Sequence, residues 1–379
     1  MTLPQQQFLE LLRSGLWSKP ANAELFRGEV DWKSIIRIAV EQTVQVIVAD
    51  GIETLPKEIW PAKEVMLKLM MVRIKTEQMH KLLNGTLNQV VTALNENNIP
   101  SVLLKGQGVA QNYPKPASRM CGDIDLYTGV ENYAQACEII ENLNHQKHHH
   151  GVESDHHMHL SLNGVEIEIH RHADLMPDKR HNLSMQQWTK ESIDAHFGTD
   201  ALKKWDNNGT NIQLATPTFN AFFILHHAVR HMTTEGVGFR QICDWVMYIH
   251  KNHQHIDTNE LKQKLIEFHM ENIWKEFGIM AIAILGLPAE ELPLIPTSME
   301  SNKTSKLLNH IFISGNFGRF DAANRGKSYL QLPYLQKKWR AFRFQITRSF
   351  KLFSLFPDYI TKRTVGWICG GIHRVLTGK

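Results

Sequence analysis

Apolar residues recur at every third or fourth position through most of the first hundred residues, and this spacing predicts helices. One helix is expected to begin after Asp31, whose carboxylate can cap its first turn. A longer helix is expected from Pro61 through Asn97, because proline is favoured in the first turn of a helix. The pattern therefore predicts a helical region over residues 1–97.

Between residues 98 and 175 the pattern changes to short strands. Four runs are apolar or alternate between polar and apolar residues, at 102–104, 123–127, 157–162 and 165–170. The last two are joined by Asn163-Gly164, a dipeptide typical of a tight hairpin. A helix is expected over 130–144. This order of elements predicts a compact α/β core.

Helical spacing returns after residue 175, with helices expected from Pro217 onward, over 240–250 and over 261–285. In the helix over 240–250, Arg240 and Asp244 lie four positions apart, and we expect an ordinary surface ion pair. The chain is thus expected to comprise a helical region (1–97), an α/β core (98–175), a second helical region (176–325) and a tail (326–379). The expected fold class is α+β, a small mixed sheet flanked by helical regions.

Composition excludes several classes of protein. The 379 residues are 42% hydrophobic and 21% charged, as in ordinary globular proteins and unlike disordered or fibrous ones. The four cysteines form no CxxC pair and are too few for a disulfide framework. The first residues lack the features of a signal peptide, and no apolar run is long enough to span a membrane. We therefore expect a cytoplasmic protein with reduced thiols.

Charge is distributed unevenly along the chain, although the net charge is only +4. Residues 326–379 contain eleven lysines and arginines against one acid, Asp358, and their basic residues alternate with aromatic ones. Such a segment suits an anionic membrane surface, an acidic partner or RNA. The plainer alternative is an amphipathic helix that docks on the acidic body through its aromatic side chains.

Carboxylates cluster on one face of the predicted strands. Asp123 and Asp125 are two positions apart, so their side chains point the same way. Glu166 and Glu168 do the same on the hairpin. Adjacent carboxylates repel each other unless a cation lies between them. Asp123, Asp125 and one glutamate are therefore candidate ligands for Mg²⁺, or two such ions. Glu168 is the better candidate, because a mid-strand carboxylate needs a partner more than one near the turn.

A glycine turn lies just upstream of these acids. A strand that runs into Gly106 and then into a helix presents backbone N–H groups to a phosphate, and glycine permits close approach. Lys105 would add positive charge, and the amide of Gln107 could donate to a phosphate oxygen. Arg119, four residues before Asp123, is expected either to contact a phosphate or to pair with an acid.

Together these residues resemble the DNA polymerase β-type nucleotidyltransferases, and in particular a bacterial branch described as an uncharacterised nucleotidyltransferase family. The resemblance spans roughly residues 99–172 and extends weakly to 225–228 and 240–244. It is carried by Leu103-Leu104-Lys105-Gly106, Tyr113, Pro116, Arg119, Gly122-Asp123-Ile124-Asp125-Leu126, Asn163-Gly164 and Glu168-Ile169-His170.

The resemblance implies transfer of a nucleoside monophosphate from an NTP to an acceptor, with release of pyrophosphate. Asp123, Asp125 and Glu168 would be catalytic and would hold Mg²⁺ or Mn²⁺. Lys105, Gly106, Gln107 and Arg119 would bind the nucleotide. Gln107 departs from the family pattern, which usually has serine or glycine there. The sequence does not name the acceptor, and a small molecule or a protein is favoured over a nucleic acid.

Two other functions remain open from the sequence. The chain could be a degenerate nucleotidyltransferase that binds a nucleotide or a partner without turnover. It could also be a metal-binding protein, because histidines are dense between residues 145 and 159. Within that stretch, His157 and His159 belong to the predicted hairpin and are expected to lie beside the carboxylates.

Overall fold

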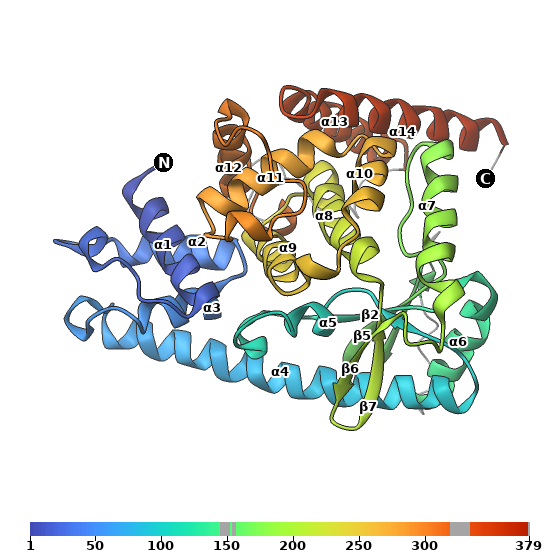
Figure 1. The fold of residues 1–379 in the computed structure, drawn as a ribbon, viewed down its shortest axis with the longest axis horizontal. Helices are drawn as coiled ribbons and strands as arrows, with labels where there is room; N and C mark the ends of the chain where they lie inside the picture. The colour runs from blue at the N-terminus through green and yellow to red at the C-terminus, as the bar shows by residue number, and fades with distance from the viewer. Residues whose placement is uncertain (145–151, 154–156, 319–333, 378–379) are drawn as a thin grey trace.

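A computed structural model describes residues 1–144, 152–153, 157–318 and 334–377 of the protein (Figure 1). The helices that it contains are α1 (Leu3–Trp17), α2 (Trp32–Glu41), α3 (Gln45–Ile52), α4 (Lys63–Glu96), α5 (Gln107–Ala110), α6 (Gly129–Leu143), α7 (Lys179–Ser192), α8 (Pro217–Thr234), α9 (Phe239–Asn252), α10 (Thr258–Glu267), α11 (Glu271–Ala283), α12 (Asn302–Ser314), α13 (Tyr334–Phe353) and α14 (Pro357–Thr377). The strands are β1 (Val102–Leu103), β2 (Asp123–Tyr127), β3 (Val152–Glu153), β4 (His157–Leu162), β5 (Val165–His170), β6 (Lys203–Asn207) and β7 (Thr210–Leu214).

The strands form one mixed sheet in the order β3-β4-β5-β2-β1-β7-β6. β2 runs parallel to β5 and antiparallel to β1, while β4–β5 and β6–β7 are antiparallel hairpins. The expected α+β class is therefore confirmed: a mixed sheet is flanked by helices that precede and follow it in the chain.

One face of the sheet is apolar and fully covered. Ile124 and Leu126 of β2 and Ile167 and Ile169 of β5 are buried in one core with residues of α4 and α6. α4 extends along one side of the molecule from the N-terminal helices to the sheet (Figure 1). Because side chains alternate along a strand, the carboxylates of β2 and β5 must point to the opposite face. That face is turned toward α8 and α9.

One sequence prediction fails after residue 175. The region expected to be helical also supplies β6 and β7, whose turn places Asn208 and Gly209 at positive φ. This is the same Asn-Gly signal as at Asn163-Gly164, but the flanking runs are too polar to read as strands. The helical segment expected over 261–285 is observed as α10 and α11, which are separated where His269 takes a left-handed conformation (φ 56°).

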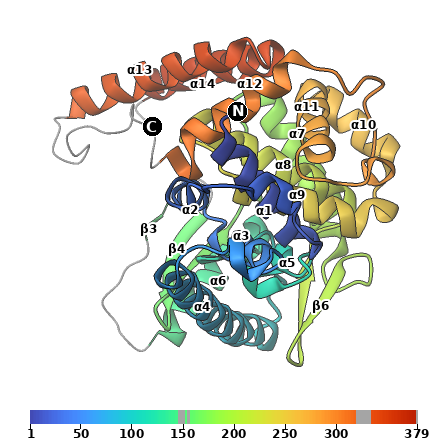
Figure 2. The ribbon, with the colours of Figure 1, turned by 90° about the vertical axis from the view of Figure 1, so that its left-hand side faces the viewer.

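The basic tail forms a helical hairpin of α13 and α14 at the outer edge of the molecule (Figures 1 and 2). Leu352, Leu355 and Phe356 are buried, and Arg348 Nε donates to the Met232 carbonyl of α8 over 2.7 Å. Several other aromatic side chains remain on the surface, namely Trp339, Phe342, Phe350 and Phe353. Docking through the aromatics is therefore observed for only part of the set. None of the described helices is long and apolar enough to cross a membrane.

Candidate active site

A cavity of about 350 Å³ lies between the polar face of the sheet and helices α8 and α9. On the sheet side it is lined by Asp123 and Asp125 of β2, His157 and His159 of β4, and Glu168 of β5. On the helical side it is lined by His227, Arg230 and His231 of α8, by Glu235 directly after α8, and by Arg240, Gln241 and Asp244 of α9. The acids on the sheet wall therefore face two arginines, Arg230 and Arg240, on the other.

The register of β2 and β5 decides which glutamate joins the aspartates. Asp123 lies opposite Glu166, and Asp125 lies opposite Glu168. The Glu166 side chain is 57% exposed and contacts His159, whereas the Glu168 side chain is only 16% exposed and lies against His170. Of these two glutamates, the structure brings Glu168 to the cavity beside Asp125.

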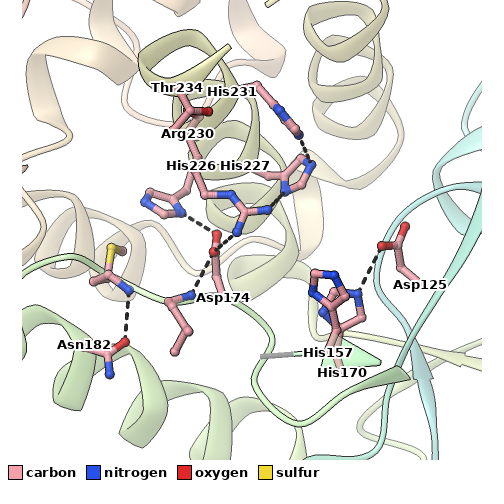
Figure 3. Close-up of polar contacts among 12 residues, drawn as sticks. Asp125, His157, His170, Asp174, Asn182, His226, His227, Arg230, His231 and Thr234 are labelled. Atoms are coloured by element: carbon pink, nitrogen blue, oxygen red, sulfur yellow. Dashed lines mark hydrogen bonds and ion pairs between the residues drawn. The ribbon is translucent and has the colours of Figure 1, made fainter. Parts of the chain in front are cut away.

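Two cations compensate these carboxylates. Lys105 Nζ is 2.8 Å from Asp125 Oδ1. His170 Nε2 is 3.2 Å from the same oxygen (Figure 3) and 3.3 Å from Glu168 Oε2. Burial by itself raises the pKa of Asp125, but Lys105 and His170 outweigh it and leave that pKa well below its ordinary value. Conversely, burial lowers the pKa of His170, and its hydrogen bonds with the two acids more than reverse this. His170 thus lies buried between two carboxylates that favour its protonated form.

Asp123 has a different environment from Asp125. The neighbouring Asp125 charge, followed by burial, raises the pKa of Asp123 above its ordinary value. Within the described residues, ligand atoms of Asp125, Glu168 and His170 lie within 4.8 Å of one another, but Asp123 is not part of this group. Of the three acids, Asp125 and Glu168 are therefore the two placed together so that they could hold a cation, and Asp123 lies beside them.

The glycine turn lies directly beside β2. Gly106 has φ +58°, and a Cβ added there would lie 3.2 Å from the Asp123 carbonyl oxygen, so both conformation and space favour glycine. Lys105 and Gly106 line the cavity as expected. The following helix α5 has only four residues, so it offers local N–H groups and little of the dipole of a full helix.

The expected role of the Gln107 side chain is wrong. Its amide nitrogen lies 2.5 Å from Asn84 Oδ1 and 3.2 Å from His80 Nδ1, both on α4. Gln107 is buried and is not among the described residues that line the cavity. The side chain thus fastens the turn to α4, and only its backbone remains available to a phosphate.

Arg119 also differs from the nucleotide contact that we expected. Its Nε and Nη2 donate to the two oxygens of Asp244 over 2.6 and 2.7 Å, and Tyr113 Oη donates to Asp244 over 2.7 Å. Arg119 and Asp244 are both buried. The structure therefore favours the structural alternative for Arg119. The expected surface pair between Arg240 and Asp244 is wrong, because Asp244 is buried and committed to Arg119.

Because Asp244 pairs with Arg119, it does not form an ion pair with Arg240. Arg240 Nη1 donates to the Met120 carbonyl over 3.2 Å, and its guanidinium lies 5.4 Å from the centre of the Phe317 ring. Its Nε is buried without a hydrogen-bond partner among the described residues, which also place no carboxylate within ion-pair distance. A guanidinium that lines a cavity without an acid is suited to a phosphate ligand.

Arg230 contributes a second cation from α8, and a buried network fixes its position. Asp174 accepts from Arg230 Nη1 over 2.9 Å and from His226 Nδ1 over 2.8 Å (Figure 3). Burial raises the pKa of Asp174, but Arg230 and His226 lower it well below its ordinary value. Sequence reasoning missed Arg230, His227 and His231. The weak resemblance at 225–228 and 240–244 marked both helices without indicating what their side chains contact.

The histidine-rich stretch is only partly described. His157 and His159 lie on β4 and line the cavity, as their alternation predicted. Burial lowers the pKa of His157 to about 4, so this imidazole is neutral near pH 7. The remaining candidates, His148, His149, His150 and His156, lie outside the described residues.

Comparisons with known proteins give the family but little beyond it. One solved structure, an antigenic nucleotidyltransferase-like protein from Paracoccidioides brasiliensis, matches with 16% identity and a TM-score of 0.32, over 50% of this chain and 88% of that one. So low a TM-score carries no argument about the site. No curated protein matches the chain. The family described as "Uncharacterised nucleotidyltransferase" matches residues 28–286, which is more than half of the chain and includes every described residue that lines the cavity except Phe317. The protein therefore belongs to this nucleotidyltransferase family.

Proposed function

We propose that the protein is a metal-dependent nucleotidyltransferase, which moves a nucleoside monophosphate from an NTP to an acceptor hydroxyl and releases pyrophosphate. One observation carries the proposal: Asp123, Asp125 and Glu168 face Arg230 and Arg240 across a single cavity. A nucleotide triphosphate with its metal ion needs both walls, because the ion binds acids and the phosphates bind cations.

The donor set supports Mg²⁺ or Mn²⁺ at the carboxylate wall. Asp125 and Glu168 offer the hard oxygen ligands that these ions prefer, with Asp123 beside them. Lys105 and His170 already place positive charge there, which supports a need for cationic compensation. A bound ion would neutralise charge on the α-phosphate and acidify the acceptor hydroxyl.

The carboxylates and the cations of the cavity would then have different roles in the reaction. The acceptor oxygen attacks the α-phosphorus as the bond to the bridging oxygen of pyrophosphate breaks, and the hydroxyl proton passes to a carboxylate. Glu168 is favoured over Asp125 for the proton, because its side chain is the more exposed of the two. Arg240, Arg230 and Lys105 would hold the β- and γ-phosphates and stabilise the charge that develops on pyrophosphate.

The acceptor that we favour is a small molecule or a protein. The basic hairpin α13–α14 lies on the far side of the helical body from the sheet (Figures 1 and 2). Binding of a polynucleotide acceptor would require a basic surface that continues from the cavity.

The test is a screen of the four common NTPs with Mg²⁺ against a panel of hydroxyl acceptors, with melting temperature and pyrophosphate release as the two measurements. We expect one NTP to raise the melting temperature and to yield pyrophosphate. Glu168→Gln should abolish the release while the protein stays folded. Stabilisation by an NTP without pyrophosphate from any acceptor would instead support the degenerate, binding-only alternative.

A further inference from the structure

Two histidines and a glutamate meet on the β4–β5 hairpin in a way that nucleotidyl transfer does not require. His157 and His159 are two positions apart on β4, so both imidazoles project from the same face of the sheet. His159 is paired directly with Glu168 across the antiparallel ladder. His157 Nε2 lies 2.7 Å from His159 Nε2, and His159 Nδ1 lies 3.4 Å from Glu168 Oε1.

This arrangement has the geometry of a three-ligand metal site. One ligand atom from each of His157, His159 and Glu168 falls within 4.8 Å of the others. A His-x-His pair on one strand with a third ligand on the neighbouring strand holds all three on a rigid, hydrogen-bonded scaffold. Three ligand atoms that each lie about 2.0–2.2 Å from one ion are separated from one another by distances close to those between these side chains. Only small side-chain movements are therefore needed to bind an ion.

The donor chemistry selects the kind of ion. Imidazole nitrogens are borderline ligands that suit zinc and its neighbours, whereas Mg²⁺ prefers oxygen. Two histidines with one carboxylate leave a fourth position open, as in zinc sites that bind a water or a substrate atom. All three side chains line the cavity, so the open position would face its interior.

We propose that His157, His159 and Glu168 bind a zinc-type divalent ion, at a site that is separate from the oxygen site around Asp125 and shares Glu168 with it. Glu168 lies between the two groups, because its Oε1 is 3.4 Å from His159 Nδ1, while its Oε2 is 3.3 Å from His170 Nε2 and 3.8 Å from His157 Nε2. The binding of zinc does not depend on the proposed function, but its effect on turnover does. An ion held by the histidine pair places positive charge beside Glu168, which makes this carboxylate a poorer acceptor for the hydroxyl proton and inhibits transfer.

The test is direct metal binding to the full chain, prepared without a histidine tag. We expect one tightly bound Zn²⁺ per chain in competition with a chromophoric chelator, and a four- or five-coordinate absorption spectrum with Co²⁺. Losing even an outer partner of a metal ligand costs about 10–100-fold in affinity, so His157→Ala and His159→Ala should each cost more than about a hundredfold.

A second His-x-His pair provides the matched control. His253 and His255 lie on a 3-10 turn, where residues two apart do not share a face, and His253→Ala and His255→Ala should leave affinity unchanged. A variant with alanine at His148, His149 and His150 tests the rest of the histidine-rich stretch and should also retain the site. Loss of zinc in that variant, with retention in His157→Ala and His159→Ala, would overturn the proposal.

Two further variants separate this proposal from the proposed function. Asp125→Asn should abolish nucleotidyl transfer and keep Zn²⁺ affinity, because Asp125 belongs only to the oxygen site. Glu168→Gln should lose both. If the wild-type protein binds no zinc but transfers nucleotides, only the zinc site is wrong. If zinc binding follows the predicted variants and no transfer occurs, the zinc site stands and the proposed function fails.

Discussion

Methionine in place of either of two arginines that line the cavity should affect different properties of the protein. At Arg119 it should lower the free energy of unfolding, and at Arg240 it should weaken nucleotide binding. Arg119 is buried in a bidentate pair with Asp244, while Arg240 has a single backbone carbonyl as its hydrogen-bond acceptor among the described residues. Arg119→Met would leave the Asp244 carboxylate buried, with Tyr113 as its one side-chain donor within the described part of the chain. Breaking a buried ion pair in this way costs about 3–5 kcal/mol of the free energy of unfolding.

Arg240→Met breaks no ion pair within the described residues. We therefore expect the free energy of unfolding without ligand to change by less than about 1 kcal/mol. Its effect should appear on nucleotide binding. A hydrogen bond to a charged group is worth about 1.5–3 kcal/mol, so losing one guanidinium contact to a phosphate should raise Kd about 10- to 150-fold.

The assay combines urea unfolding without ligand with calorimetric titration of an α,β-methylene NTP in the presence of Mg²⁺. The methylene bridge prevents turnover, so the titration reports binding alone. Arg240→Lys is the matched conservative variant and should recover part of the affinity through its single charge. The reasoning is refuted if Arg240→Met destabilises the protein as much as Arg119→Met while its Kd stays at the wild-type value.

Three other predictions follow from the same geometry. Glu168→Gln should abolish pyrophosphate release, whereas Glu166→Gln, on the same face but more exposed, should change the rate by less than about tenfold. In metal-free buffer at pH 7, Asp123→Asn should raise the free energy of unfolding, because ionisation of a group with a raised pKa destabilises the fold, and this gain should fade as pH falls through that pKa. Asp125→Asn should lower it, because a carboxylate with a lowered pKa stabilises the fold at neutral pH, and this loss should fade toward low pH. Urea unfolding curves in which both substitutions shift the free energy of unfolding in the same direction would contradict one of these two predictions. The exposed aromatic and basic side chains of α13 should bind vesicles containing anionic lipid but not neutral ones, and Phe350→Ser should weaken co-sedimentation.

The strands and their acids could be predicted because side chains two positions apart on a strand point to the same face of the sheet. The β4–β5 hairpin has the predicted bounds, and the alternation correctly placed Asp125 and Glu168 on one polar face. The choice of Glu168 over Glu166 followed from position along the strand, and the structure brings the same residue to the cavity. Local spacing was sufficient for the face of each strand, whereas the pairing of β2 with β5 comes from the order of strands in the sheet.

The helical wall of the cavity could not be predicted in the same way. Arg240 lies more than a hundred residues from Asp123, and no local pattern shows that α9 packs over β2 or that Asp244 is taken by Arg119. Gln107 was misplaced for a related reason, because its partners His80 and Asn84 lie on α4, which the sequence did not position against the turn. Side-chain partners that depend on tertiary packing have no signature in the spacing of residues.

The most direct test of nucleotidyl transfer compares NTP labelled at the α-phosphate with NTP labelled at the γ-phosphate. In the presence of Mg²⁺ and an acceptor, the account predicts that the α-label passes to the acceptor and the γ-label leaves as pyrophosphate. Both results should disappear with Asp125→Asn or with chelator. Transfer of the γ-label to the acceptor, or α-label transfer that survives in Asp125→Asn, would contradict the account.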